Sequence, residues 1–268
     1  MQDRAGARRI LEWQMAMGAD EAILDAPRDR LAAKPIPAAT GPAARPRPSA
    51  PAPAPTPPPA IEAQSAVIAS ARTLAESADS LERLRSILES FDGCSLRRTA
   101  THTVFADGNP KAPVMLIGEA PGADEDRVGR PFVGRSGQLL DRMLAAAGIS
   151  RAQNAYITNI LFWRPPGNRK PTTEETAICL PFVWRHIALL APKIVVLCGG
   201  TATSALLGRA DGITRLRGRW FDLPVPGLPE PVPAIATYHP SFLLRAPGHK
   251  GESWRDLISI QSKLASLQ

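Results

Sequence analysis

Four short apolar runs, separated by stretches of helical periodicity, constrain the fold of this 268-residue chain more than any other feature. The runs extend over Val114 to Ile117, Tyr156 to Leu161, Ile194 to Cys198 and Ile235 to Tyr238. The helical pattern covers residues 136–147, about 173–190, 201–207 and 252–266. Strands that alternate with helices in this way form mostly parallel sheets that are covered on both faces. We therefore expect a three-layer α/β/α fold with a central four-stranded, mostly parallel sheet.

A segment rich in proline and alanine divides the chain into unequal parts. Between residues 34 and 60, 11 of 27 residues are Pro and 8 are Ala, which leaves few backbone donors and little to bury. We expect a disordered, semi-rigid linker there. The sequence predicts an N-terminal helical appendage at 1–33, a helical lead-in at 61–90 and the α/β catalytic domain at 91–268.

The charge balance points to nucleic acid as the partner class. Lys and Arg number 32 against 25 Asp and Glu, a formal net charge of +7. No apolar run approaches the roughly 18 residues of a membrane span, and the N-terminal residues lack the apolar region of a secretion signal. We expect a cytoplasmic, nucleoid-associated protein with no membrane partner. Three cysteines are too few and too scattered for a disulfide framework.

The residues that follow the expected strands carry most of the candidate chemistry, because ligands bind beyond the carboxyl ends of parallel strands. After the first strand, LIGEAPGADEDRVGRPFVG places Glu119, Asp124, Glu125 and Asp126 within eight positions. The later strands are followed by NILFWRPPGNRKP, GGTATSALLG and YHPSFLLRAPGHK. From Leu161 to Trp220, nine basic residues face three acids, a local excess of 9 − 3 = +6. A cluster of acids is therefore expected beside a basic surface.

These motifs resemble one known family. GEAPGADED, GRPFVG with SGQLL, NxxxxRPPGNR and HPSFLLR occur in the order found in family 4 uracil-DNA glycosylases, and the resemblance covers about residues 91–262. Four motifs in order are a far more specific signal than any one of them. The resemblance implies a uracil-DNA glycosylase-like fold and hydrolysis of the N-glycosidic bond of deoxyuridine in DNA. Such an enzyme releases uracil, leaves an abasic site and initiates base excision repair.

By resemblance, three side chains contact the flipped base. Phe132 would stack on it, the alternative being an ordinary core aromatic. Asn159 would offer its amide to O4 and N3–H of uracil, the alternative being a residue that caps a turn. His239, which a following proline holds in extended backbone, would bind O2 as negative charge develops there, although a lone histidine is more often structural.

The resemblance also assigns roles in the first loop. The backbone amides of Gly118, Glu119 and Ala120 are expected to help bind O2, with Glu119 acting mainly through its backbone. Related families place an aspartate where this chain has Ala120. We therefore expect Glu125 to be the catalytic carboxylate that orients water, or to exclude the methyl group of thymine. Asp124 and Asp126 are expected to be solvated.

The remaining motif residues are expected to position DNA. Ser136 would cap a helix and bind a phosphate, with capping alone equally compatible. Phosphate contacts are also expected from a Pro-rich loop, where the alternative is generic surface charge; its residues are Arg164, Asn168 and Arg169. Leu243 and Leu244 resemble the wedge that fills the gap left by an extruded base, or form the first turn of a buried helix. Arg245, in the same motif, would contact DNA.

The family pattern breaks at its metal cofactor. Family 4 enzymes usually bind a 4Fe-4S cluster through four cysteines, of which this chain keeps Cys94 and Cys179 and has Phe91 and Trp163 at the other two positions. We expect a branch of the family without the cluster, with apolar packing in its place and no cofactor. Cys198 is expected to be a small buried hydrophobe. A zinc site completed by His102 and His186 is disfavoured because paired ligand spacing is missing.

The reaction class follows from what the motifs contain. No lysine nucleophile is evident at the site, so we expect a monofunctional glycosylase without strand cleavage. The alternative is a catalytically weak or inactive DNA-damage-binding module on the same fold. A phosphate-handling enzyme is disfavoured, because a Walker lysine pattern is missing. We expect a monomer that acts on uracil-containing DNA, with an appendage that docks on the domain or recruits a repair or replication protein.

Overall fold

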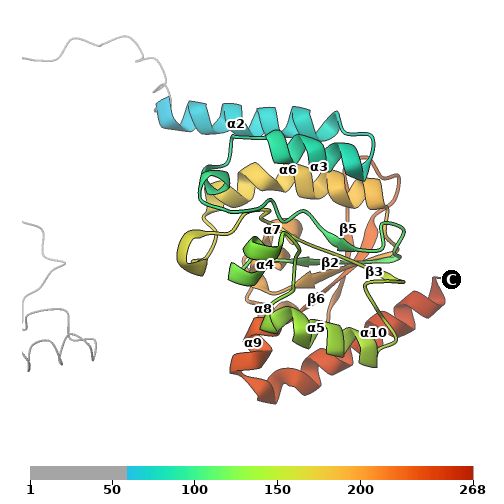
Figure 1. Ribbon diagram of the computed structural model, residues 1–268. Coiled ribbons are helices and arrows are strands. Elements are labelled where there is room, and N and C mark those ends of the chain that lie inside the picture. Colours follow the sequence, from blue (N-terminus) through green and yellow to red (C-terminus); the bar gives the residue numbers. More distant parts are fainter. Residues whose placement is uncertain (1–58, 268) are drawn as a thin grey trace, which may run out of the picture. The chain divides into compact units, whose positions relative to one another are not determined.

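A six-stranded sheet runs through the part of the chain that the computed structural model describes, residues 59–267, with side chains from residue 63 onward (Figure 1). The strand order is β1-β3-β2-β4-β6-β5. The strands are β1 Asp107–Gly108, β2 Val114–Gly118, β3 Ala155–Asn159, β4 Ile194–Cys198, β5 Trp220–Leu223 and β6 Val232–Thr237. The expected appendage at 1–33 and all but the last two residues of the expected linker at 34–60 lie outside the described residues.

The four central strands are parallel, as the alternation of apolar runs predicts. The prediction of four strands in total was too low, because antiparallel strands β1 and β5 extend the two edges. These edge strands lack the continuous apolar run of a strand that is buried on both faces. β1 has only two residues, and of the four residues in β5 only Leu223 is buried.

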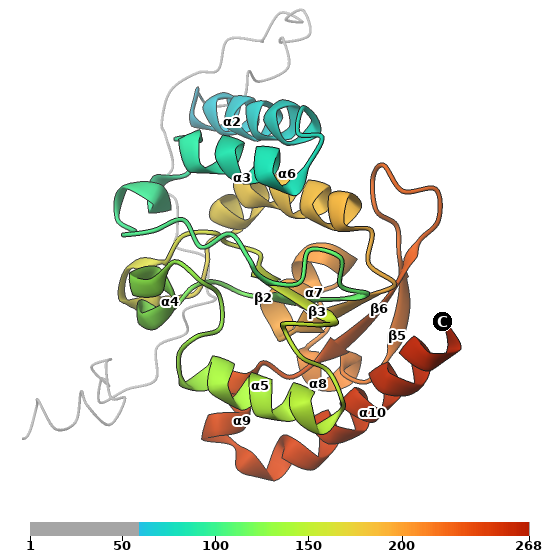
Figure 2. The ribbon, with the colours of Figure 1, turned by 45° about the vertical axis from the view of Figure 1, so that its right-hand side comes forward.

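Helices cover both faces of the sheet, so the three-layer prediction is confirmed (Figures 1 and 2). Their bounds are α2 Pro59–Glu76, α3 Leu81–Ser90, α4 Ala123–Val128, α5 Arg135–Ala146, α6 Thr173–Leu190, α7 Gly200–Leu207, α8 Ile213–Leu216, α9 Pro240–Arg245 and α10 Lys250–Ser266. Short 3₁₀ turns lie at Ser95–Arg98, Pro166–Asn168 and Pro247–His249. Among the described helices, none combines the length and the apolar character that a bilayer crossing requires.

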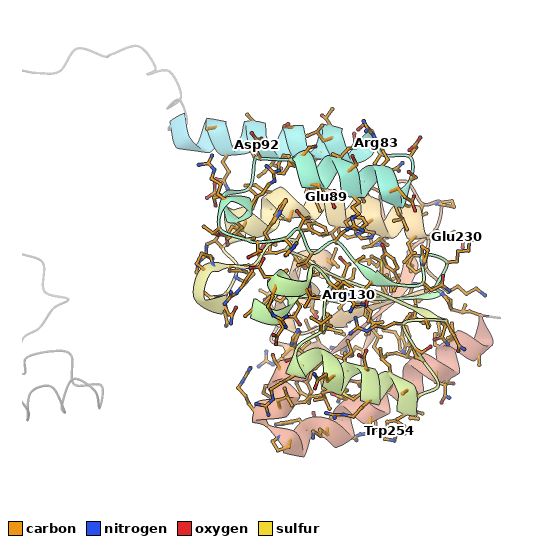
Figure 3. All side chains as sticks on the ribbon, viewed as in Figure 1. Arg83, Glu89, Asp92, Arg130, Glu230 and Trp254 are labelled. Atoms are coloured by element: carbon orange, nitrogen blue, oxygen red, sulfur yellow. The ribbon has the colours of Figure 1, made fainter. Side chains whose placement is uncertain are left out.

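Alternation along the strands divides the core between the two faces. Met115 and Ile117 of β2 pack toward α2, α3 and α6, whereas Val114 and Leu116 pack toward α5 and α10. The outer helices are amphipathic: α10 buries Leu257, while its Trp254 is 42% exposed and lies on the side away from the sheet (Figure 3). Each of the four central strands is therefore covered on both sides and is predominantly apolar, with Thr158, Asn159 and Thr237 as polar residues at the carboxyl ends.

The lead-in at 61–90 forms two helices, not one. α2 begins at Pro59, within the expected linker, and α2 and α3 both pack on α6. The Nε and Nη2 atoms of Arg185 on α6 donate to the carbonyl oxygen of Ala78, at 2.8 and 2.6 Å. Leu84 and Leu88 are fully buried in the same core as the sheet residues. This lead-in thus completes the hydrophobic layer over α6.

Candidate active site

The carboxyl ends of the four parallel strands meet along one edge of the sheet. Gly118 of β2 pairs with Asn159 of β3, and Cys198 of β4 pairs with Thr237 of β6. The chain leaves β2 for β3 on one side and returns to β4 on the other, so the switch in strand order falls between β2 and β4. A cleft of about 970 Å³ lies at this edge, which is where doubly wound sheets place their ligands.

The cleft brings together most of the residues that the motifs single out. Those lining it are Glu119, Ala120, Glu125, Phe132, Ser136, Asn159, Asn168, Arg169, His239 and Arg245. They come from the segments at the carboxyl ends of β2, β3 and β6, and the segment after β4 adds Gly199, Gly200, Thr201 and Ser204. Gly118 lies buried beneath it, while Arg164, Leu243 and Leu244 do not line it. Phe132, Asn159 and His239 thus line one part of the cleft, called the slot below, with an aromatic ring, a carboxamide and an imidazole.

Phe132 lies at the bottom of the cleft in a strained conformation. Its backbone φ is +54°, a left-handed value that costs a bulky residue on the order of 1–3 kcal/mol. Such a conformation persists only where contacts with the surroundings offset that cost. Its ring centroid is 5.4 Å from that of His239, and the side chain is 4% exposed. A Cβ at Gly118 would lie 2.5 Å from the Phe132 ring, so only glycine lets the ring pack onto β2 at that point.

Asn159 is the last residue of β3 and is 1% exposed. Its Oδ1 atom has no hydrogen-bond partner among the residues that the structure describes. A buried amide oxygen without a partner is unfavourable, and such groups are rare in folded proteins. Oδ1 also lies 2.4 Å from the position that a Cβ at Gly118 would occupy, which places it beside the Phe132 ring. The carboxamide is therefore a group that a ligand in the cleft would satisfy.

His239 caps α9 and presents one defined ring nitrogen to the cleft. Its Nδ1 accepts from the Ser241 backbone N–H at 3.2 Å and lies 2.8 Å from the Ser241 hydroxyl. Burial, together with the nearby positive charge of Arg245, lowers the pKa of His239 to about 4. The ring is therefore neutral at physiological pH. Because Nδ1 accepts a backbone N–H, the proton is carried by Nε2, which can donate.

A buried ion pair holds the strand that carries His239. Asp256 of α10 is 2% exposed and accepts from the Thr237 hydroxyl at 2.7 Å, two positions before His239. The Arg217 guanidinium binds the same carboxylate through Nε at 3.2 Å and through Nη2. Paired charges and satisfied hydrogen bonds are what make a buried carboxylate tolerable. α10 is thereby fastened to the end of β6.

The Glu125 carboxylate accepts hydrogen bonds from backbone amides. Its Oε1 accepts from the N–H groups of Val133 and Gly134 at 2.9 and 2.8 Å, and its Oε2 accepts from Gly122 at 3.0 Å. The carboxylate thus caps the first turn of α4 and holds the segment that follows Phe132. Three charge-assisted hydrogen bonds leave it less able to accept from a water molecule.

Glu119 has a different environment. Its Oε2 accepts from the hydroxyl of Thr201, at the start of α7, and its other oxygen receives no hydrogen bond from the described residues. The side chain is partly buried and lines the cleft. The contact joins the segments that follow β2 and β4, on the two sides of the switch point. Sequence reasoning did not find Thr201, although its position just after a strand was a usable signal.

Of the two acids expected to be solvated, only Asp124 is. Asp124 is exposed and pairs with Arg127, at 3.3 Å. The prediction for Asp126 was wrong: it is 5% exposed, and its Oδ1 accepts from the backbone N–H groups of Thr101 and His102 at 2.8 and 3.1 Å. The segment around residue 101 has no regular backbone partner there, so the carboxylate supplies the acceptor that these amides need.

Two expectations about helix ends need correction. Gly134 is the N-cap of α5, so Ser136 lies inside the first turn and is not the capping residue; it still lines the cleft. Leu243 is fully buried against Leu139 and Tyr238 and does not reach the surface, which matches the alternative of a buried helical turn. Leu244 is 38% exposed. A wedge formed by both leucines is therefore incompatible with this structure, and the wedge role remains a prediction for Leu244 alone.

The Pro-rich loop after β3 is held by its own polar contacts. Arg164 Nε donates to Asn168 Oδ1 at 2.8 Å, while Arg169 forms a two-pronged ion pair with Glu175 of α6 at 2.9 and 2.5 Å. That pairing is the main cause of the lowered pKa of Glu175. Much of the hydrogen-bonding capacity of Arg169 is therefore used within the protein, and the exposed Lys170 beside it also lines the cleft.

Comparisons with known proteins agree with this geometry. Residues 105–258 match the uracil DNA glycosylase superfamily. The chain belongs to that superfamily. Its relatives include the type-4 uracil-DNA glycosylase of Pyrobaculum aerophilum, 37% identical over 181 residues that make up 66% of this chain and 91% of the relative. The type-4 enzyme of Thermotoga maritima is 41% identical over 153 residues, 57% of this chain and 77% of the relative.

A more distant group of glycosylases is also similar. The type-5 uracil-DNA glycosylase of Thermus thermophilus is 37% identical over 114 residues, which cover 37% of this chain and 52% of that enzyme. The type-4 relatives thus match a longer part of the chain. Membership in the superfamily rests on the span from β1 to α10, which contains all four segments that line the cleft.

The residues at the family's cluster position do not fit an iron–sulfur cluster. Cys94 and Cys179 are both buried, and the interaction between their thiols lowers the pKa of Cys94 and raises that of Cys179. Phe91 packs edge-on against Phe182 at 5.1 Å, and Trp163 is 1% exposed with its Nε1 donating to Thr103. Two thiolates cannot hold a four-iron cluster, and the aromatic rings occupy the surrounding core.

A zinc site is not assembled either. His102 Nδ1 lies 2.6 Å from the carbonyl oxygen of Asp126, and His186 Nε2 lies 2.8 Å from the Tyr156 hydroxyl. Among the described residues no three metal-binding side chains come together. Cys198 is buried, and burial raises the pKa of its thiol to about 12. It packs in the core as a small apolar residue.

We expect stability to fall in mild acid because His186, which is buried, and His239, which is partly buried, resist protonation. Burial lowers the pKa of His186 to about 3 and is the main cause that lowers that of His239 to about 4, from a usual value of 6.5. Below pH 6.5 the two histidines bind protons in the unfolded chain but not in the folded chain. Each therefore lowers the free energy of unfolding by about 2 kcal/mol at pH 5. Urea unfolding at pH 7.5 and pH 5 measures the loss.

The matched control is His186→Phe, which keeps the ring stack on Phe105 at 4.4 Å but cannot titrate. It removes a partner of Tyr156 at both pH values, so the two unfolding curves shift together. The difference between pH 7.5 and pH 5 should shrink by about 2 kcal/mol in this variant. If the difference in unfolding free energy between the two pH values were unchanged in His186→Phe, protonation of His186 on unfolding would not be a cause of the lost stability.

Proposed function

We propose that the protein is a monofunctional uracil-DNA glycosylase that hydrolyses the N-glycosidic bond of deoxyuridine in DNA. The observation that carries the proposal is the buried Asn159 carboxamide, whose oxygen has no partner among the described residues and which lies beside an aromatic ring in the cleft. Membership in the superfamily and similarity to type-4 enzymes support it. An inactive damage-binding module is not favoured, because the slot keeps its complete set of base-contacting groups.

The slot suits uracil better than cytosine. A flipped base lying on Phe132 would direct its Watson–Crick edge toward Asn159. The carboxamide offers one acceptor for N3–H and donors for O4. Cytosine would present an amino group to the amide donors and an unprotonated N3 to the amide oxygen. A donor would then face a donor, and an acceptor would face an acceptor. Discrimination then rests on one buried amide at the end of β3.

His239 would stabilise the leaving base. As the glycosidic bond breaks, negative charge develops on uracil O2, and the Nε2–H of a neutral imidazole donates to it. The ring already has the required tautomer because Ser241 occupies Nδ1. Backbone amides in the Gly118–Ala120 segment can add donors. Since the chain places the proton on Nε2 before substrate arrives, no reorganisation of the ring is needed during the reaction.

We assign the water-orienting carboxylate to Glu119 in preference to Glu125. Glu119 keeps one oxygen that no described residue engages, and Thr201 fixes the other. Glu125 already accepts three backbone hydrogen bonds. A carboxylate near the anomeric carbon can orient water and stabilise the positive charge on the sugar. The missing aspartate at Ala120 is then compensated by the neighbouring residue and not by Glu125, which serves as a clamp.

DNA would lie across the open side of the cleft. Phosphate contacts are assigned to basic and polar residues of the cleft, namely Arg135, Ser136, Asn168, Arg169, Lys170 and Arg245, and to Arg164, which lies in the loop after β3 outside the cleft lining. Leu244 is the exposed apolar side chain on α9 that could enter the base stack after a nucleotide flips out. We further propose that the protein acts as a monomer at the nucleoid, where this substrate is found, and that the appendage at 1–33 recruits a repair or replication protein.

We also propose that this chain works without an iron–sulfur cluster. Phe91, Trp163 and Phe182 pack around the two remaining cysteines, and the Arg169–Glu175 ion pair fastens the loop that a cluster would hold in type-4 relatives. Aromatic packing and an ion pair can fix a loop as a metal centre does. No step of the proposed reaction needs a metal.

The direct test is release of free uracil from a labelled oligonucleotide that contains one deoxyuridine. We expect release by the wild-type protein and a fall of about 10²- to 10³-fold in the single-turnover rate for His239→Ala, because one donor to the developing anion is lost. Binding of the same oligonucleotide carrying non-cleavable 2′-fluorodeoxyuridine should change less than about threefold, since the donor acts mainly in the transition state. Equal rates for the two proteins would remove His239 from the mechanism.

The two carboxylates are separated by Glu119→Gln and Glu125→Gln. The first should lower the single-turnover rate on the order of 100-fold and leave the melting temperature nearly unchanged, because it removes the acceptor for water. The second should lower the melting temperature, because the clamp on Val133 and Gly134 weakens, and any loss of rate should accompany that loss of stability. If Glu125→Gln gave the larger loss of rate at unchanged stability, the water-orienting role would return to Glu125.

Iron and acid-labile sulfide in anaerobically purified protein test the cofactor proposal. We expect far less than four irons per chain, since two thiolates are insufficient ligands. The double variant Phe91→Cys with Trp163→Cys restores four thiols and serves as the positive control for cluster assembly during expression. A stoichiometric cluster in the wild-type protein would overturn the proposal.

A further inference from the structure

Arg151 lies outside every motif, yet it makes two hydrogen bonds to the Phe132 segment, residues 131–134, as many as Glu125 makes. It stands in the connection between α5 and β3, and its guanidinium is 16% exposed. Nη1 donates to the carbonyl oxygen of Pro131 at 2.8 Å, and Nη2 donates to that of Phe132. A single side chain thus binds the carbonyl groups before and after the Cα of the strained residue.

Two carboxylates hold the guanidinium in that position. Nη1 also donates to Asp107 of β1 at 2.9 Å, and Nε donates to Asp141 of α5 at 2.7 Å. The edge strand, the helix and the loop are therefore joined through one planar group. Arginine suits this position because its fork offers several donors in fixed directions, which the single ammonium of lysine cannot reproduce.

The segment is gripped from the opposite side by Glu125. Glu125 accepts from the N–H groups of Val133 and Gly134, whereas Arg151 donates to the carbonyls of Pro131 and Phe132. A negative and a positive side chain thus hold four consecutive residues by their complementary backbone groups. Phe132, with φ of +54°, lies in the middle of this grip. A left-handed bulky residue persists only where its surroundings impose that conformation.

We propose that Arg151 is a positioning residue that holds the Phe132 ring as the platform for the flipped base. The proposal rests on the proposed glycosylase function, since it supplies the substrate that the ring would contact. The ring already touches the strand at Gly118 and lies 5.4 Å from the His239 ring, so a change in the Phe132 backbone would displace the platform relative to both base-binding groups. Displacement of about 1 Å is enough to slow an enzymatic step on the order of 100-fold.

The test compares Arg151→Gln with Arg185→Gln. Arg185 is a matched control, because it also grips a backbone carbonyl through two nitrogen atoms but contacts Ala78, which does not line the cleft. Both variants should lower the melting temperature. Only Arg151→Gln should lower the single-turnover rate of uracil release on the order of 100-fold, with Arg151→Lys intermediate. Equal rate losses in the two glutamine variants would overturn the proposal.

A double-mutant cycle shows whether Arg151 acts through Phe132. In a Phe132→Ala background the platform is absent, so Arg151→Gln should change the remaining rate less than about threefold. A loss as large as in the wild-type background would mean that Arg151 acts by another route, and the proposal would fail.

Hydrogen exchange provides a readout that does not depend on activity. The backbone amides of Val133 and Gly134 should exchange faster in Arg151→Gln, and not in Arg185→Gln, because the grip on their segment is released. Unchanged exchange in Arg151→Gln would overturn the proposal. If exchange rose as expected while the wild-type protein released no uracil, the proposed function would fail and the grip on the loop would stand.

Discussion

The parallel alignment of β3, β2, β4 and β6 is the constraint on which the site depends. It brings four carboxyl ends to one edge, where Asn159 ends its strand and His239 follows closely after another. Those two side chains are 80 positions apart in the chain, yet a hydrogen-bonded register places their strands on either side of β2 and β4. The slot for a base is therefore set by backbone pairing, and the loops only fill it with chemical groups.

In the cluster-free arrangement that we propose, apolar packing supports this edge of the sheet. Trp163 is buried in the loop after β3 and donates to Thr103, while Phe91 packs edge-on against Phe182 of α6. A buried aromatic contact orders a loop without requiring a reduced thiol or an iron supply. In that arrangement the loop after β3 depends on side-chain packing. The ion pair of Arg169 with Glu175 then contributes more to holding the loop in place.

The sequence predicted the central strands because burial on both faces leaves a continuous apolar run, as in Ile194–Cys198. It could not predict β1 or β5, which are short and only half buried. Asn159 and His239 were recognisable at strand ends, but Thr201, 82 positions from Glu119, carries no local signal of its partner. Asp126 was misassigned because a surface-like cluster of acids gives no hint that the amides of Thr101 and His102 need an acceptor.

The acids of the first loop show why a basic protein keeps a cluster of negative charge beside its binding cleft. Asp126 and Glu125 accept backbone N–H groups and so hold irregular segments that have no strand partner. Asp124 is paired with Arg127 in solvent. Glu119 keeps an oxygen that the described residues leave unengaged at the cleft and is partly buried there, whereas Asp124 is exposed. Two of the four carboxylates, Glu125 and Asp126, thus hold backbone segments, and Glu119 is left as the partly buried charge where a positive sugar would form.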